Sequence, residues 1–322
     1  MTFRNVARLS DVGSMCELLE HMGTNVDSKD WKNKKTLRLQ TSKIASHEAP
    51  YDLVRKMRAS ILTLGPTIAR HGKAKVSLPG GCAIGTRPVN FHIDGIERLG
   101  AKVDIEHGYV VASAPKRLKG TDITLPLPSV TGTENLMMAA TLAKGTTRLI
   151  NAAREPEISD LAHCLNAMGA KISGIGTSTL IIEGVDALQG IEYEILPDRI
   201  EAGTYAVAAA ITGGNIEIIN GRLDDLPGFK ESMEQAGVSL TPTAKGFSVK
   251  GKNTLVGTDI VTDFYPGFAT DLQAQFMALM TIAEGVSVIK ENIWENRFDY
   301  LIQFRAQPNN SATSYSIRIN KF

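Results

Sequence analysis

The chain has 322 residues, of which 43% are hydrophobic and 21% charged, and its formal net charge is +1. This composition is typical of a soluble globular protein long enough for two domains, and so balanced a charge gives no bulk attraction to nucleic acid or to an anionic membrane. No run approaches the roughly 18 apolar residues that span a bilayer, and the first residues lack the apolar segment of a signal peptide.

The cysteines are few and far apart. Their odd number and wide spacing favour a reducing compartment over a disulfide framework or a zinc site. We therefore predict a cytoplasmic protein, and no pattern in the sequence indicates a metal, a haem or a redox cofactor. The three cysteines are Cys16, Cys82 and Cys164.

Two sequence marks recur about every 70 residues, which indicates an internal repeat. In each mark a helical segment ends at a glycine, the residue that most readily takes the left-handed cap conformation, and a strand-like run follows. The repeat predicts an α/β fold of subdomains packed around pseudo-symmetry with their helices inside. The glycines of the first mark are Gly23, Gly100, Gly169 and Gly237, and those of the second are Gly72, Gly145, Gly214 and Gly285.

The first predicted helices cover residues 11–22 and a segment that starts at Pro50, a residue favoured at the first helical position. Apolar side chains at helical spacing, among them Leu53, Met57 and Ile61, give the second segment a core face. Arg58 lies beside that face, so it belongs either to the surface or to a cleft.

Residues 76–90 form a predicted loop, because glycines and prolines gather there between two apolar runs. Cys82 lies near its tip, and the cation Arg87 follows five residues later. A nearby positive charge favours the thiolate, and such a thiol can also act as a proton donor. The alternative is that Cys82 is a small buried hydrophobic residue beside a turn.

Two further helix starts carry polar residues. Thr131 and Glu134 have the spacing of a capping box ahead of an apolar helix, and such a helix start either binds an anion or is simply capped. Residues 270–273 are predicted to open another apolar helix with the same kind of cap, with Asp271 complementing the helix dipole. Arg297 follows a strand and is a candidate for an ion pair. The last residues, 303–322, are polar without helical periodicity and are predicted to be an unrelated tail.

Six segments, taken in order, resemble the UDP-N-acetylglucosamine 1-carboxyvinyltransferase family of enolpyruvyl transferases. The resemblance runs from about Phe3 to Arg297. The six segments are residues 57–60 (MRAS), 78–89 (LPGGCAIGTRPV), 151–158 (NAAREPEI), 196–201 (LPDRIE), 270–276 (TDLQAQF) and 295–298 (ENRF).

The resemblance implies an inside-out α/β barrel with two domains of repeated βαβαββ units. It places the first domain, with the cysteine loop and the sugar-nucleotide site, at residues 1–196, a partial second domain at 197–302 and the non-matching tail at 303–322. The family's chain starts a few dozen residues earlier, with a Lys-Asn pair that contacts phosphoenolpyruvate, and continues past Arg297. We therefore expect a chain truncated at both ends, with an incomplete second domain.

The implied reaction moves the enolpyruvyl group of phosphoenolpyruvate onto the 3-hydroxyl of UDP-N-acetylglucosamine, the first committed step of peptidoglycan synthesis. Cell wall biogenesis, cell shape and cell division depend on that step. The resemblance implies these two substrates as the partners of a monomeric protein, with no nucleic acid, membrane or cofactor.

The resemblance also assigns roles to individual residues. Cys82 matches the proton donor that fosfomycin attacks, and Asp271 matches the proposed general base. Arg87 also faces phosphoenolpyruvate. The residues that match substrate contacts are Arg58, Arg87, Pro88, Val89, Asn90, Phe91, Leu127, Pro128, Ser129, Val130 and Ile293.

Two positions depart from the family's pattern, because Asn90 replaces a usual aspartate and Leu127 stands where a lysine is common. Two alternatives stay open beside the transferase. One is a catalytically inactive truncated homologue that retains at most sugar-nucleotide binding. The other is the sister shikimate-phosphate enolpyruvyl transferase, against which the cysteine loop and the NAAREPE segment argue.

Overall fold

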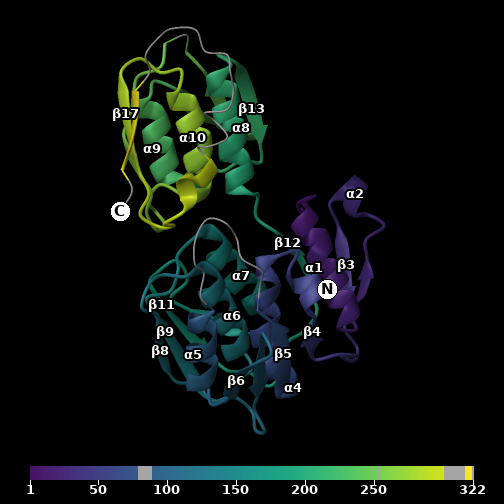
Figure 1. The fold of residues 1–322 in the computed structure, drawn as a ribbon. Coiled ribbons are helices and arrows are strands. Elements are labelled where there is room, and N and C mark those ends of the chain that lie inside the picture. Colours follow the sequence, from purple (N-terminus) through teal and green to yellow (C-terminus); the bar gives the residue numbers. More distant parts are fainter. Residues whose placement is uncertain (79–88, 253, 301–315, 321–322) are drawn as a thin grey trace. The chain divides into compact units, whose positions relative to one another are not determined.

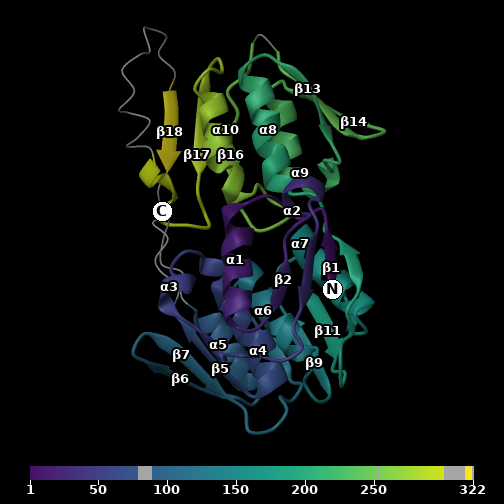
Figure 2. The same cartoon turned by 90° about the vertical axis from the view of Figure 1, so that its right-hand side faces the viewer.

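A computed structural model describes residues 1–78, 89–252, 254–300 and 316–320, which form two compact units (Figures 1 and 2). Unit 1 comprises the described residues up to Leu196, and unit 2 comprises those from Pro197 onward. The loop predicted to carry Cys82, Arg87 and Pro88 lies outside the described residues.

Unit 1 contains three four-stranded sheets with the same pattern of pairing. In each sheet one edge strand is parallel to its neighbour, and the other neighbouring strands are antiparallel. This repetition is the pseudo-symmetry predicted from the spacing of the glycines. The sheets are, in spatial order, β12 (Glu192–Glu194), β1 (Thr2–Arg4), β3 (Leu37–Gln40) and β2 (Asn25–Asp27); β4 (Glu48–Ala49), β5 (Lys73–Ser77), β7 (Tyr109–Ser113) and β6 (Lys102–Glu106); and β8 (Asp122–Thr124), β9 (Thr146–Ile150), β11 (Thr179–Glu183) and β10 (Lys171–Ser173).

Helices connect the strands of unit 1, and two of them form its interior. The chain passes through α4 between the parallel strands β4 and β5, and through α6 between β8 and β9. Seven of the 11 residues of α6 are buried, as expected for a helix that is apolar nearly all round. The helices are α1 (Ser10–His21), α2 (Trp31–Lys34), α3 (Tyr51–Val54), the 3₁₀ helix η1 (Arg58–Thr63), α4 (Leu64–His71), α5 (Asn90–Arg98), α6 (Val130–Ala140) and α7 (Pro156–Ala167).

Gly65 allows α4 and α6 to approach closely. A Cβ atom at this position would lie 2.3 Å from the backbone oxygen of Asn135, so any larger residue would push the two helices apart. The Gly65 N–H instead donates a 2.7 Å hydrogen bond to the Asn135 side-chain oxygen. This contact joins α4 and α6 within the core of unit 1.

The structure corrects several details of the predicted helices. Pro50 is the N-cap of α3 rather than its first residue, and the segment predicted as one helix is divided into α3, η1 and α4. The positive backbone angle expected at Gly214 belongs to its neighbour Gly213, where φ is 64°. The other glycines of both marks do adopt positive φ, but Gly145 and Gly285 lie in turns beyond the C-caps of α6 and α10, which are Thr141 and Thr281, so these two glycines are not helix caps.

Unit 2 has a layer of helices between two three-stranded sheets, with α8, α9 and α10 lying between β13 and β17 (Figure 1). One sheet is antiparallel and the other is parallel. The strands are β13 (Asn215–Ile219), β15 (Gly246–Lys250) and β14 (Ser239–Thr243), then β16 (Ile260–Val261), β17 (Val286–Lys290) and β18 (Ser316–Asn320); the helices are α8 (Arg199–Ile211), η2 (Leu223–Asp225), α9 (Pro227–Gln235), η3 (Thr270–Leu272), α10 (Gln273–Met280) and η4 (Arg297–Tyr300).

Aromatic side chains form the centre of unit 2. The Phe268 ring lies 6.0 Å from that of Phe229 and 5.4 Å from that of Phe276, between centroids. These distances suit tilted and edge-on ring packing. In the part of the chain that the structure describes, no helix is long and apolar enough to cross a membrane.

Candidate substrate and catalytic sites

The residues predicted to contact the sugar nucleotide in unit 1 lie mainly at helix starts. Arg58 is the first residue of η1. Val89 is the N-cap of α5, and Asn90 and Phe91 are its first two residues. Free N–H groups point outward at such ends and attract negative charge.

Residues 127–130 lead into α6. Leu127 is 55% exposed, so it is accessible from solvent. Ser129 is the N-cap, and its hydroxyl oxygen accepts a 3.2 Å hydrogen bond from the Gly132 N–H. The capping box predicted at Thr131 and Glu134 is therefore wrong, because Ser129 provides the cap two residues earlier.

Gly132 is needed for this cap. A Cβ atom there would lie 2.9 Å from the Ser129 hydroxyl oxygen and 3.6 Å from the Phe91 Cβ atom. The start of α5 therefore lies against the start of α6, and two of the predicted contact segments are neighbours.

Two buried polar side chains fix these helix starts. Asn135 donates from its amide nitrogen to His92 Nδ1 at 2.8 Å and to the Ile61 carbonyl at 3.3 Å. Because Nδ1 accepts, the neutral His92 ring carries its proton on Nε2, which lies 3.5 Å from the Thr131 hydroxyl. We call Arg58, His92, Ser129, Thr131 and Asn135 the helix-start cluster.

His92 is uncharged at neutral pH. Burial, followed by the positive charge of Arg58, lowers the pKa of His92 to about 4. The imidazole therefore links α5 to α6 without adding a charge, and Arg58 supplies the positive charge of this cluster. An arginine beside two helix starts is suited to binding a phosphate group.

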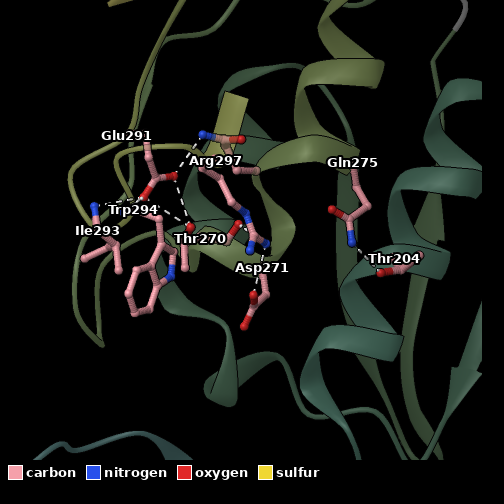
Figure 3. A network of polar contacts seen from close by, with 9 residues as sticks. Thr204, Thr270, Asp271, Gln275, Glu291, Ile293, Trp294 and Arg297 are labelled. Carbon is pink, nitrogen blue, oxygen red and sulfur yellow. Dashed lines mark hydrogen bonds and ion pairs between the residues drawn. The ribbon is translucent and has the colours of Figure 1, made fainter. Parts of the chain in front are cut away.

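In unit 2, Asp271 lies in η3 and pairs with Arg297. The Arg297 Nη2 atom donates to Asp271 Oδ1 at 3.0 Å and to the Thr270 carbonyl at 2.9 Å (Figure 3). This confirms Arg297 as an ion-pairing residue. Side-chain exposure is 57% for Asp271 and 14% for Arg297, so the carboxylate is accessible while its cation is largely covered.

The predicted cap of the following helix is absent. Residues 270–272 form a turn of 3₁₀ helix, and neither η3 nor α10 has a side-chain cap hydrogen bond. Thr270 instead donates its hydroxyl proton to Glu291, which also accepts from the backbone N–H of Ile293 at 2.8 Å. We call these residues the Glu291 network (Figure 3), which consists of Thr270, Gln273, Glu291, Ile293 and Trp294.

Sequence reasoning missed a cavity of about 460 Å³ in unit 1, lined by α1, η1, α4, α6 and α7. Its walls are mainly apolar, with Leu19, Met138 and Leu161 among them. Glu134 also lines it, and burial, followed by the charges of Glu157 and Glu155, raises the pKa of Glu134 to about 8. The polar pattern that was interpreted as a helix cap thus places a carboxylic acid beside this cavity.

Comparison with known proteins shows the family of the chain. Residues 1–305 match the family model described as EPSP synthase (3-phosphoshikimate 1-carboxyvinyltransferase). A UDP-N-acetylglucosamine 1-carboxyvinyltransferase from Gluconobacter oxydans (strain 621H) is 55% identical over 298 residues, which is 92% of this chain and 70% of that protein. One of the same name from Thermodesulfovibrio yellowstonii (strain ATCC 51303 / DSM 11347 / YP87) is 53% identical over 304 residues, or 94% of this chain and 72% of that protein.

Solved structures show the same fold. The enolpyruvyl transferase NikO from Streptomyces tendae superimposes with a TM-score of 0.82 at 20% identity, covering 97% of this chain and 74% of that one. An EPSP synthase from Acinetobacter baumannii gives 0.66 at 19% identity, covering 90% and 67%. At these identities the likeness shows the fold alone.

Proposed function

The chain belongs to the UDP-N-acetylglucosamine 1-carboxyvinyltransferase family of enolpyruvyl transferases, and from this we propose that it transfers the enolpyruvyl group of phosphoenolpyruvate to the 3-hydroxyl of UDP-N-acetylglucosamine. The observation that carries the proposal is 55% identity over 298 residues, which include both the helix-start cluster and Asp271. The reaction is a step of peptidoglycan synthesis.

The helix-start cluster is suited to the sugar nucleotide. UDP-N-acetylglucosamine carries a diphosphate, and Arg58 together with the N–H groups at the starts of α5 and α6 offers complementary positive charge. The exposed Leu127 adds an apolar contact beside them. We assign substrate binding in unit 1 to Arg58, to residues 87–91 and to residues 127–130.

Asp271 is suited to act as the general base. Its carboxylate is 57% exposed while Arg297 holds one of its oxygens, so a substrate hydroxyl can reach it in a fixed orientation. Asp271 takes the proton of the 3-hydroxyl as the 3-oxygen bonds to C2 of phosphoenolpyruvate, and the Cys82 thiol gives a proton to C3. Loss of a proton from C3 and departure of phosphate then restore the double bond.

Further properties of the family are proposed for this chain. We infer that fosfomycin attacks Cys82, that the protein acts as a monomer in the cytoplasm, and that it binds neither nucleic acid nor membrane. Cell shape and cell division depend on the same step. We expect fosfomycin to inhibit phosphate release, which tests its reaction with Cys82. We expect light scattering to give the mass of a monomer.

The direct test is phosphate release by the purified 322-residue chain supplied with both substrates. We expect release that requires both UDP-N-acetylglucosamine and phosphoenolpyruvate and that disappears in Cys82→Ala. Release with shikimate 3-phosphate as acceptor would contradict the assigned acceptor. A folded chain that binds UDP-N-acetylglucosamine without releasing phosphate would instead be the inactive homologue that retains sugar-nucleotide binding.

A further inference from the structure

Glu291 is a buried carboxylate that no sequence motif singled out. It follows β17 directly and is 2% exposed. A carboxylate this deeply buried is costly unless its oxygens are hydrogen-bonded. The protein therefore has to supply donors to Glu291 from nearby segments.

Four donors from two segments meet this carboxylate. The Oε1 atom accepts from the backbone N–H groups of Ile293 at 2.8 Å and Trp294 at 3.0 Å. The Oε2 atom accepts from the side-chain amide of Gln273 at 2.8 Å. The Thr270 hydroxyl is shared, lying 3.2 Å from Oε1 and 3.0 Å from Oε2.

The positions of these donors connect two residues assigned to the reaction. Thr270 and Gln273 lie on either side of Asp271 in the chain, and Ile293 is itself a donor. One carboxylate thus holds the segment that carries the proposed base and the segment that carries a proposed nucleotide contact (Figure 3). Arg297 adds a second attachment between the same two segments through the Thr270 carbonyl and Asp271.

We propose that Glu291 is a positioning residue, which sets the Asp271 carboxylate and the Ile293 backbone in their working geometry through its four hydrogen bonds. The proposal rests on the role proposed above for Asp271 and on the substrate contact that the family resemblance implies for Ile293. Misplacing a reacting group by about 1 Å can cost about 100-fold in rate, so the effect on turnover should be large although Glu291 does not contact substrate.

Replacement by glutamine gives a nearly isosteric test. In Glu291→Gln the remaining oxygen can still accept from Ile293 and Trp294, but the new NH2 group would face the NH2 group of Gln273, and these two donors cannot bond unless the Gln273 amide turns over from its present orientation. The reciprocal double variant, Glu291→Gln with Gln273→Glu, restores one donor and one acceptor at that contact. A matched control is Glu284→Gln, because Glu284 is exposed and lies just before the other end of β17.

The kinetic experiment measures phosphate release with both substrates varied. In Glu291→Gln we expect kcat to fall about 10- to 100-fold and KM for UDP-N-acetylglucosamine to rise, while Glu284→Gln stays within about twofold of the unmodified chain. The reciprocal double variant should recover at least half of the loss in kcat on a logarithmic scale. In an Asp271→Asn background, Glu291→Gln should cost little more, because residues that act through one another are not additive.

A second measurement does not depend on turnover. Amide hydrogen exchange at Ile293 and Trp294 should accelerate about 10-fold in Glu291→Gln and not in Glu284→Gln, because those N–H groups then bond to a neutral amide oxygen, a weaker acceptor than the charged carboxylate. An unmodified chain that releases no phosphate would overturn the proposed function, and unchanged exchange would overturn the positioning role. An unchanged kcat would also overturn the positioning role, and so would losses in kcat that are additive with Asp271→Asn. A lower thermal midpoint with an unchanged kcat per folded molecule would show that Glu291 supports stability alone.

Discussion

The helix-start cluster of unit 1 and the Glu291 network of unit 2 use buried polar groups in opposite ways. In unit 1 the connecting groups are neutral, an amide and an imidazole, and the cluster's positive charge comes from Arg58. In unit 2 the connecting group is a carboxylate with four donors, beside an exposed Asp271 that is bonded to Arg297.

The difference matches the roles that we propose for the two sites. A binding site for a diphosphate is stronger if its supporting hydrogen bonds add no negative charge near the ligand. A general base needs a carboxylate that is accessible to the substrate but held in a fixed position. A second carboxylate nearby, buried and fully hydrogen-bonded, can hold the segment that carries this base. The comparison therefore predicts that changes at Asp271 act mainly on turnover, whereas changes in the helix-start cluster act on binding and stability.

Removing the proposed base should have the largest effect. Asp271→Asn keeps the size of the side chain and removes its ability to take a proton, so kcat for phosphate release should fall by about 10²–10⁴-fold. Calorimetry should show UDP-N-acetylglucosamine binding within about threefold of the unmodified chain. A fall in affinity with kcat preserved would break the division of tasks between the two units.

Glu134 should make the stability of unit 1 depend on pH. Its pKa is raised from 4.5 to about 8, so the folded protein holds a proton that the unfolded chain releases. This contribution is complete below pH 4.5 and is lost as pH rises through 8, and the part lost between pH 5 and pH 8 is about 3–4 kcal/mol of unfolding free energy.

Urea unfolding at several pH values measures this change. In Glu134→Gln the decline in unfolding free energy between pH 5 and pH 8 should disappear, whereas Glu183→Gln, at an exposed strand position, should leave it unchanged. A decline of the same size in both variants would show that other groups are responsible.

Truncating the central amide of the helix-start cluster should come next in size. Asn135→Ala leaves the buried Gly65 N–H and His92 without their partners, which should cost about 2–3 kcal/mol of unfolding free energy. Because α5 and α6 are then held less precisely, the affinity for UDP-N-acetylglucosamine should also fall. Asn25→Ala, at an exposed position of β2, is the control, and equal losses in both variants would refute the role of Asn135.

The smallest expected effect concerns the departure at Asn90. This exposed residue begins α5, and Asn90→Asp would place a negative charge at a helix start, which stabilises by about 0.3–1 kcal/mol. Thermal unfolding at low and high salt should show the gain only at low salt. A gain that persists in 1 M salt would rule out the dipole as its cause.

Short-range patterns predicted much of this fold. Gly72 and Gly145 stand where the chain leaves an inner helix, and their positive φ was predictable because other residues rarely adopt it. The all-round apolar segment 135–143 likewise indicated the buried part of α6. The resemblance then supplied the fold class and the positions of the candidate sites.

Contacts between distant segments were not predictable in this way. Glu291 receives donors from residues about 20 positions earlier, and no spacing rule connects them. Glu134 has the spacing of a capping box from Thr131, but the backbone of α6 begins one residue before Thr131 and turns that carboxyl group toward a cavity instead. Packing between elements decided both cases.

The pairing of β1 with β12 has a consequence for synthesis on the ribosome. Thr2 pairs with Glu192, so at about 5–20 residues per second the partner of β1 emerges roughly 10–40 s after β1 itself. The sheets of β4–β7 and β8–β11 are each encoded within one contiguous stretch and can assemble as they leave the exit tunnel. Strand β1 is thus among the last strands of unit 1 to be completed, and its edge toward β12 stays unpaired until that strand has been made.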